Sequence, residues 1–233
     1  MSSTRRTAAN IDPREQPAYG LAEAARYLRL PAATLRAWVF GRRYPTAKGD
    51  GQFQPLLRPA STRPPLLSFS NLIEAHVVRA LRTEHGVSIK ALRRAVRFAE
   101  HALSIERLLL RPELRAEAGR VFLDRYGELI NLSASGQLAM RQLLDVHLNR
   151  VQWERNFPVR LHPFVVGDAL DVDMPIAIDP RISFGRPVVA SRGVSTAAIV
   201  ERIDAGESVA SIAEDYELTT QEVERAVVYE RAA

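Results

Sequence analysis

The spacing of apolar residues near the start of the chain predicts two short helices joined by a tight turn. Apolar positions recur every three or four residues over residues 21–28 and again over about 32–40, as on helices with one buried face. Pro31 separates the two runs, because it lacks a backbone donor and suits the first turn of a new helix. Trp38 could stack on a base, but its spacing from Leu35 favours a place in the core. This arrangement is typical of a helix-turn-helix.

The next segment predicts strands and turns, followed by two longer helices. Glycines and prolines punctuate residues 41–67. A helix should then begin at Ser70 or Asn71, either of which can cap free backbone donors, and run to about residue 84. A further helix should follow over residues 88–103. Its apolar stripe consists of Ile89, Leu92, Ala95, Val96, Ala99 and Leu103.

The rest of the chain alternates short β segments with helices. Residues 121–132 alternate apolar and polar positions on both sides of Gly127, which predicts a hairpin. Residues 136–148 have the pattern of an amphipathic helix, and residues 151–166 that of extended backbone. Two short strands are expected within residues 176–189. Three helices should follow, at 196–204, 208–216 and 219–229. The expected fold class is therefore mainly α with small β hairpins (α+β), ending in a three-helix, homeodomain-like bundle.

Charge is divided unevenly along the chain. The formal net charge is +5, but residues 1–167 carry +12, with 26 Lys or Arg against 14 Asp or Glu, whereas residues 168–233 carry −7. Between residues 19 and 100 there are 14 basic and 5 acidic residues. A basic excess in a helix-turn-helix region favours DNA binding over a merely solvated loop.

Candidate DNA-contacting residues lie on the second helix and on the hairpin after it. With the apolar residues of this helix turned to the core, small residues around Arg36 remain on the opposite face. They allow close approach to a major groove, where an arginine matches the acceptor pair on a guanine edge. Basic residues of the hairpin can reach phosphates. The candidates are Ala33, Thr34, Arg36, Ala37, Phe40, Arg42, Arg43, Tyr44, Lys48 and Arg58.

The order of these pieces resembles the winged helix-turn-helix of the MerR family over residues 19–104. The resemblance rests on Ala22-Glu-Ala-Ala-Arg-Tyr-Leu28, Thr34-Leu-Arg-Ala-Trp38, Leu67-Ser-Phe-Ser-Asn-Leu72 and His85-Gly-Val-Ser-Ile89. In that family the helix corresponding to residues 88–103 pairs with its twin, so that two readers of a palindrome lie about one helical turn (~34 Å) apart. The apolar stripe is then either domain core or a dimer seam, and we expect a homodimer.

The C-terminal bundle has the shape of a DNA reader without the charge for one. Its helices carry carboxylates such as Glu214, Asp215 and Glu217, which phosphates would repel. Protein binding is therefore the better use of this bundle, with a merely structural cap as the alternative.

Residues 176–230 resemble a small domain, numbered 433 among domains of unknown function, that occurs in VapB-type antitoxins. The resemblance rests on Ile178-Asp-Pro-Arg-Ile-Ser-Phe-Gly-Arg-Pro-Val-Val189 and on Ile199-Val-Glu-Arg-Ile-Asp-Ala-Gly-Glu-Ser-Val-Ala-Ser-Ile-Ala-Glu-Asp-Tyr216. The chain departs from the family at Ser191 and Ser195, where glycine and proline are usual. Together with the MerR-like part, the chain resembles VapB antitoxins of type II toxin–antitoxin systems that also carry a DNA reader. The resemblance implies toxin neutralisation together with repression of the chain's own operon.

The partner that this resemblance implies is a ribonuclease toxin of the PIN-domain class. Such toxins gather carboxylates around a magnesium ion, with which an antitoxin arginine would compete. For each candidate taken alone, an ordinary surface arginine is the favoured interpretation. The candidates for toxin binding are Arg155, Arg160, Arg181, Arg186 and Arg192.

The sequence favours neither catalysis nor a cofactor. The histidines His76, His85, His101, His147 and His162 are scattered, and the chain has neither a Walker loop nor a Rossmann glycine fingerprint. The absence of cysteine excludes disulfides and thiolate metal sites. With no secretory leader and no apolar run of membrane length, we expect a cytoplasmic protein that is not an enzyme.

We expect four parts: a flexible tail (1–18), a MerR-like DNA-binding and dimerisation domain (19–104), a central linker of hairpin and helix (105–167) and a toxin-binding domain (168–233). The alternative to an antitoxin is a MerR-like regulator whose C-terminal half senses a small molecule. A third possibility is an adaptor without a DNA role, which would show no salt-dependent affinity for DNA.

Overall fold

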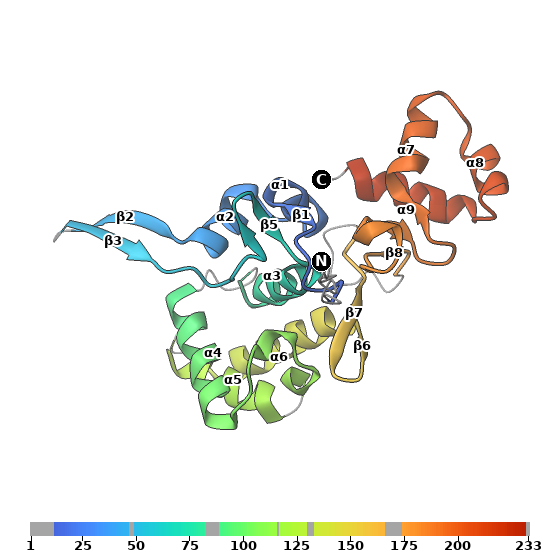
Figure 1. The fold of residues 1–233 in the computed structure, drawn as a ribbon. Coiled ribbons are helices and arrows are strands. Elements are labelled where there is room, and N and C mark those ends of the chain that lie inside the picture. The colour runs from blue at the N-terminus through green and yellow to red at the C-terminus, as the bar shows by residue number, and fades with distance from the viewer. Residues whose placement is uncertain are drawn as a thin grey trace, which may run out of the picture.

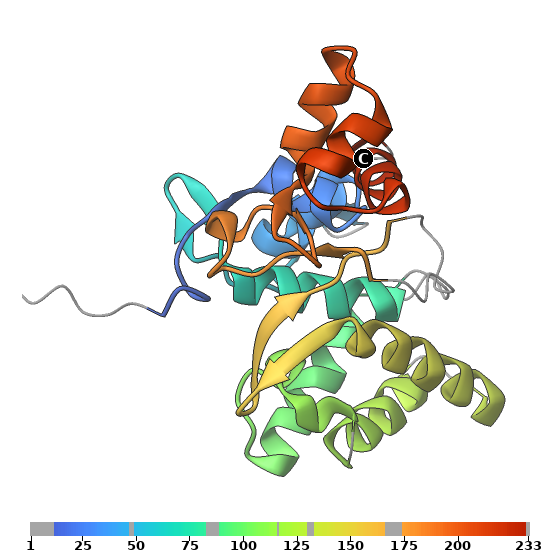
Figure 2. The same cartoon turned by 90° about the vertical axis from the view of Figure 1, so that its right-hand side faces the viewer.

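Three layers follow one another in the molecule (Figures 1 and 2): a C-terminal bundle, a central helix-turn-helix and a helical base. The computed structural model describes residues 12–46, 49–82, 89–115, 117–129, 133–165 and 174–231. The mixture of helices with small antiparallel sheets confirms the predicted fold class.

The central layer begins with the predicted helix-turn-helix, α1 (Leu21–Tyr27) and α2 (Ala32–Phe40). Trp38 is buried, which confirms its place in the core. A small antiparallel sheet in the order β1-β5-β4 lies beside these helices, formed by β1 (Tyr19–Gly20), β5 (Pro65–Leu67) and β4 (Ser61–Thr62). A separate hairpin, β2 (Arg42–Thr46) and β3 (Gly49–Phe53), projects away from α2 (Figure 1).

Helix α3 (Phe69–Arg82) lies between the central layer and the base, and it begins earlier than predicted. The capping residue is Ser68 and not Ser70 or Asn71. The Ser68 hydroxyl accepts a hydrogen bond from the backbone N–H of Asn71 (3.2 Å), and the Asn71 side-chain oxygen accepts one from the backbone N–H of Ser68 (3.1 Å). Because both residues are buried, this reciprocal pair satisfies donors that water cannot reach.

The base consists of three helices that pack on one another, together with two short 3₁₀ turns. These elements are α4 (Ile89–Leu103), η1 (Leu108–Leu110), η2 (Pro112–Arg115), α5 (Glu117–Leu129) and α6 (Ala134–Asn149). The predicted hairpin around Gly127 is therefore wrong, because α5 covers most of that segment. Phe122 and Tyr126 are buried one turn apart. Gly127 leaves room for the Gln137 side chain of α6, since a Cβ at this position would lie 2.6 Å from the side-chain nitrogen of Gln137.

One hydrophobic core joins the central layer to the base. It runs from Tyr19 to Leu161 and includes Ile178. The central region 105–167 is thus part of the first folding unit and not a linker as expected. The apolar stripe of α4 is already buried, and α4 packs mainly against α5 of the same chain.

A hairpin leads from the base to the C-terminal bundle. It is formed by β6 (Val151–Glu154) and β7 (Phe157–Leu161), and the backbones of Leu161 and Ile178 exchange two hydrogen bonds, of 2.8 and 2.9 Å. The bundle contains β8 (Ile176–Ala177), η3 (Ser183–Gly185), β9 (Val188–Val189), β10 (Val194–Ser195), α7 (Thr196–Asp204), α8 (Val209–Asp215) and α9 (Thr220–Arg231). Strands β8 and β9 and the three helices lie close to where the sequence predicts them, whereas β10 and η3 were not predicted. These elements surround a second core that includes Ile199, Ile212 and Val223.

Residues 12–18, which we expected in a flexible tail, are bonded to the central layer. The backbone N–H of Ala18 donates to Leu67 O (2.9 Å), and the backbone N–H of Ser70 donates to Arg14 O (3.0 Å). The rest of the expected tail lies outside the described residues. Among the described helices, none combines the length and the apolar character that crossing a bilayer requires.

Candidate nucleic-acid and protein interfaces

The outer face of α2 presents small residues around one arginine. Ala33 and Arg36 are exposed, and Thr34 and Ala37 are half-buried. Phe40 is also half-buried, at the edge of the first core, and the Arg36 guanidinium lies 5.4 Å from the centre of its ring. The face is therefore low in relief, with Arg36 as its charged side chain, and such a face suits the major groove.

Arg42 and Arg43 lie at the root of the β2–β3 hairpin, directly after α2. They pair in register with Phe53 and Gln52, and both arginines are exposed. Because successive residues of a strand point to opposite faces, the hairpin carries one guanidinium on each side. The hairpin reaches well beyond α2 (Figure 1), as a wing must do to contact neighbouring phosphates. The Tyr44 side chain and all of Lys48 lie outside the described residues.

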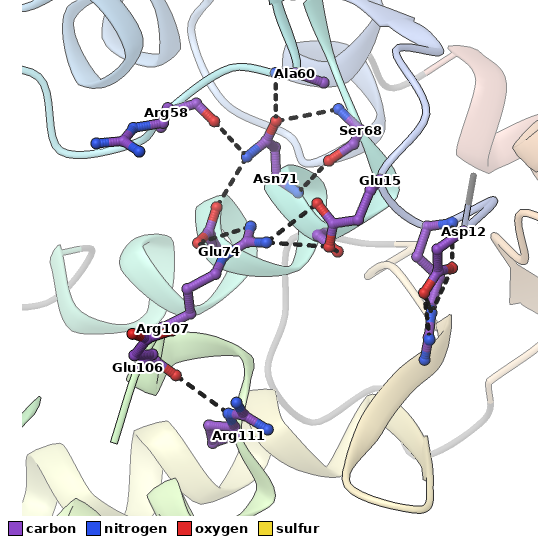
Figure 3. Close-up of polar contacts among 12 residues, drawn as sticks. Asp12, Glu15, Arg58, Ala60, Ser68, Asn71, Glu74, Glu106, Arg107 and Arg111 are labelled. Carbon is purple, nitrogen blue, oxygen red and sulfur yellow. Dashed lines mark hydrogen bonds and ion pairs between the residues drawn. The ribbon is translucent and has the colours of Figure 1, made fainter. Parts of the chain in front are cut away.

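The loop that carries Arg58 is fixed to α3 by Asn71 (Figure 3). The Asn71 side-chain nitrogen donates to Arg58 O (2.9 Å) and to a carboxylate oxygen of Glu74 (2.9 Å), while its oxygen also accepts from the backbone N–H of Ala60 (3.1 Å). The Arg58 side chain itself is exposed. Sequence reasoning treated Asn71 only as a helix cap and missed this positioning role, because the loop and the helix meet only in the folded chain.

An ion-pair cluster next to Asn71 joins the base to the central layer (Figure 3). The Arg107 guanidinium lies 3.1 Å from the Glu74 carboxylate and 3.0 Å from the Glu15 carboxylate. Burial raises the pKa of Glu74, and the charge of Arg107 opposes this shift. A cleft of about 1150 Å³ opens beside the cluster, lined by charged residues of both layers.

A second basic surface, which sequence reasoning did not single out, lies on α4. Lys90, Arg94 and Arg97 are exposed on this helix. Arg93 donates a hydrogen bond to the backbone oxygen of Gln54, which directly follows β3 at the base of the β2–β3 hairpin (the wing). The contact fixes the basic helix relative to the wing, so both can face the same polyanion.

Two of the predicted toxin-binding arginines meet around one buried carboxylate. Arg160 lies 3.3 Å from Asp179, and Arg181 lies 3.1 Å from Asp179 and 3.4 Å from Glu154. Burial raises the pKa of Asp179, but hydrogen bonds from Arg181 and the charge of Arg160 outweigh it, and the pKa stays below its usual value. This cluster fixes the β6–β7 hairpin to the bundle.

The other three arginines lie apart from one another. Arg186 forms an ion pair with Glu23 of α1, and Arg192 lies 3.1 Å from Glu217 within the bundle. Arg155 is exposed at the tip of the β6–β7 hairpin, where its φ is 47°. Within the described residues it is the one of the five candidates that forms no ion pair. Its guanidinium is therefore the one most open to an incoming carboxylate.

A cleft of about 620 Å³ connects Arg155 with the Asp179 cluster. It is lined by Asp12, Pro13, Arg14, Glu154, Arg155, Phe157, Val159, Pro180 and Arg181. Phe157 is half exposed, and the Arg14 guanidinium lies 4.5 Å from the centre of its ring. The lining of the cleft thus combines apolar side chains with arginines.

The bundle packs on α1 through polar groups of α9. Arg26 forms an ion pair with Glu230, and the Arg29 guanidinium donates to the backbone oxygen of Tyr229 (2.9 Å). The Tyr229 hydroxyl in turn donates to Tyr27 O (3.3 Å). The first helix of the helix-turn-helix is therefore held directly by the C-terminal bundle.

Acidic side chains remain exposed on the bundle, including Glu214, Asp215, Glu217 and Glu224. Phosphates would be repelled here, which agrees with a surface that binds protein. Within the described part of the chain, no group of three or more His, Asp or Glu side chains is arranged to hold a metal ion.

Two family models match the chain. The model described as "Putative DNA-binding HTH domain" matches residues 17–96, which cover the central layer and the first half of α4. The model described as "Protein of unknown function (DUF433)" matches residues 176–229, which cover the bundle.

Two proteins of Mycobacterium tuberculosis (strain ATCC 25618 / H37Rv) are similar to the chain over most of its length. "Putative antitoxin VapB45" is 29% identical over 232 residues, which cover 91% of this chain and 92% of that protein. "Uncharacterized protein Rv2308" is 26% identical over 227 residues, which cover 92% of this chain and 90% of that protein. The crystal structure of Rv2018 from Mycobacterium tuberculosis has the same fold, with a TM-score of 0.66 at 23% identity, over 91% of this chain and 98% of that one.

Proposed function

We propose that the chain is a type II antitoxin that is not itself an enzyme, and that it represses its own operon. Its helix-turn-helix binds operator DNA, and its hairpin and bundle bind and inhibit a ribonuclease toxin of the PIN-domain class. The observation that carries the proposal is the similarity to a putative antitoxin over 91% of the chain, with the two matched domains in one polypeptide. The opposite charges of the two halves support the division of roles.

The DNA-binding part rests on the α2 face and the wing. Both carry exposed arginines, and the loop with Arg58 is held beside them. A palindromic operator requires two readers, so we include a homodimer in the proposal. The α4 stripe that first indicated a dimer is already covered by α5, so another surface must form the dimer seam.

The DNA-binding part is tested by fluorescence anisotropy on a duplex from the chain's own promoter. Arg36→Ala should weaken binding about 10-fold to 100-fold and reduce the preference for this duplex over a scrambled one. The structure describes four of the candidate arginines. The logarithm of the binding constant should therefore fall linearly with the logarithm of the salt concentration, with a slope of about −3 to −4 for each bound helix-turn-helix. Arg192→Ala, in the acidic bundle, is the matched control and should bind normally. Equal binding of promoter and scrambled duplexes by the full chain would refute a repressor.

The toxin-binding part is tested with the protein encoded by the reading frame next to the chain's gene. Co-expression of the chain should restore growth that this protein arrests, and Arg155→Ala should weaken the rescue, because Arg155 is the candidate without an internal partner. Arg94→Ala, at an exposed arginine of α4 outside the hairpin and the bundle, serves as the control. If the neighbouring protein neither arrests growth nor binds the chain, the antitoxin function is wrong.

The alternative, a regulator that senses a small molecule with its C-terminal half, predicts a ligand site in that half. Clefts occur in both halves: the 1150 Å³ cleft lies between α3 and α4, and the 620 Å³ cleft is lined largely by residues of the C-terminal half. The similarity to a putative antitoxin over 91% of the chain, and not the placement of the clefts, favours the antitoxin.

A further inference from the structure

Phe184 is far more exposed than the other large apolar residues that the structure describes. Its side chain is 92% exposed, whereas the next values are 58% for Leu138 and 47% for Phe157. Exposure of a whole phenyl ring to water is unfavourable, and nothing within the described chain covers this one. An aromatic side chain in such a position is typical of an anchor that a binding partner buries.

The backbone around Phe184 holds the ring in a conformation that its residue type disfavours. Ser183, Phe184 and Gly185 have φ values of 48°, 53° and 76°, in the left-handed region that favours glycine. Strain of this kind persists only where the surroundings impose it, and it gathers at functional sites.

The turn that carries Phe184 is rigid. The backbone N–H of Ile182 donates to Asp179 O (2.9 Å), and that of Arg186 donates to Ser183 O (3.0 Å). Gly185 packs directly on the Tyr19 hydroxyl and leaves no room for a Cβ. Asp179, at the start of the turn, is buried and held by Arg160 and Arg181. The ring is thus presented in one orientation before any partner arrives, which lowers the entropy lost on binding.

The charges next to the turn indicate what kind of surface would receive the ring. Arg181 and Arg186 flank Phe184, and their side chains are 52% and 48% exposed, so each keeps donors for a carboxylate from outside. Arg181 also lines the 620 Å³ cleft, together with the exposed Arg155. An apolar ring between arginines is complementary to an apolar pocket with an acidic edge.

We propose that Phe184 is the anchor of the protein-binding surface: it enters an apolar pocket on the partner protein whose edge carries carboxylates, while Arg181, Arg186 and Arg155 pair with that edge. This inference rests on the proposed function, since the partner is the neutralised toxin. The inference identifies the side chain through which the chain holds that toxin. A second copy of the chain is the competing occupant.

The experiment measures binding by isothermal titration calorimetry between the full chain and the protein encoded next to its gene. Phe184→Ala should weaken binding at least about 30-fold, as for an aromatic hot spot. Leu138→Ala, at the next most exposed apolar side chain, is the matched control and should change binding less than about 2-fold. Phe184→Leu should recover part of the affinity. Melting curves check folding, and Phe184→Ala should melt no lower than the parent chain because its ring packs against nothing described.

Three results would overturn the inference, and they are distinguishable. Binding by the parent chain together with unchanged binding by Phe184→Ala would refute the anchor and leave the antitoxin function standing. No binding by the parent chain would refute both. A self-association in sedimentation experiments that Phe184→Ala abolishes, with binding of the neighbouring protein intact, would assign the ring to a second copy.

Discussion

Asp179 is a carboxylate that is 1% exposed and yet holds two layers together. Two arginines from different segments converge on it, Arg160 from β7 and Arg181 from the following turn. A sequence shows the arginines but not their partners, because Arg160 and Asp179 meet only through the register of β7 with Ile178. This is why sequence reasoning found the candidate arginines without separating Arg155, which forms no described ion pair, from those with structural partners.

Asp179→Asn should destabilise the fold by about 2 kcal/mol, since hydrogen bonds from two guanidinium groups lose their charged acceptor. The effect should depend on pH, because the folded-state pKa of Asp179 lies below the unfolded value of about 3.9. The stabilisation is fully present above that value and is lost as the pH falls through the lower, folded-state pKa. Urea unfolding at pH 7 measures the difference. Glu217→Gln breaks an exposed ion pair and should change stability by less than about 1 kcal/mol.

Phe184→Gly should raise the stability of the free protein by about 1 kcal/mol, because glycine adopts the left-handed conformation without strain. The ring makes no buried contact that the change would remove. Differential scanning calorimetry should show a higher melting temperature for this variant. Titration calorimetry should show weaker binding of the partner. A lower melting temperature would show that the ring stabilises the turn.

At the scale of elements, the helices predicted best were those with a regular apolar face and clear ends. Helices α2, α7 and α8 lie within one residue of the predicted bounds. The prediction failed for α5, where Gly127 resembled a turn residue. In the structure this glycine serves the close contact with Gln137 of α6, and that contact depends on how two helices pack, which local spacing does not record.

The contact between α3 and α6 contains two buried histidines that should make stability depend on pH. The His76 ring nitrogen lies 3.0 Å from His147 O, and the His147 ring lies 3.0 Å from Leu143 O. Burial is the main reason that the pKa of His147 is lowered to about 4; the hydrogen bond to Leu143 O opposes this shift, and the charges of Arg79 and Arg150 add to it. The unfolded chain, with a histidine pKa near 6.5, therefore takes up the proton first as the pH falls.

The stability that neutral His147 supplies is present above about pH 6.5 and is lost between there and about pH 4. Chemical unfolding should give a free energy about 2 kcal/mol lower at pH 5 than at pH 7 from this residue alone. His147→Gln keeps a hydrogen-bond donor but does not titrate. This variant should therefore show a smaller difference in unfolding free energy between pH 5 and pH 7. An unchanged difference in this variant would assign the pH dependence to other groups.

At the scale of the whole molecule, a small polar contact between α9 and α1 joins the bundle to the helix-turn-helix, alongside the ion pair between Arg186 and Glu23. Glu230 is nearly buried there, where it accepts a hydrogen bond from the Thr196 hydroxyl (2.5 Å) and pairs with Arg26. Sequence reasoning predicted both units but not this contact, because its members are about 200 residues apart and none of them shows a motif.

Glu230→Ala should separate the unfolding of the two units. It leaves Arg26 without its partner and removes the acceptor of Thr196, a loss of about 1–3 kcal/mol in the docking of the bundle. Calorimetry should then resolve two transitions where the parent chain shows one. Glu224→Ala, on the exposed face of α9, is the control and should unfold as the parent does. Two transitions already present in the parent chain would show that the docking contact is weak.

The placement of Tyr229 and Glu230 in the final turn of α9 has a consequence for how the two units influence one another. Local unwinding of this single turn would release the groups that hold Arg29 and Arg26. Most of the bundle's own core would stay intact, because it is built from residues further back in the chain. Fraying of one helical turn is therefore enough to loosen α1 from the bundle without unfolding either unit.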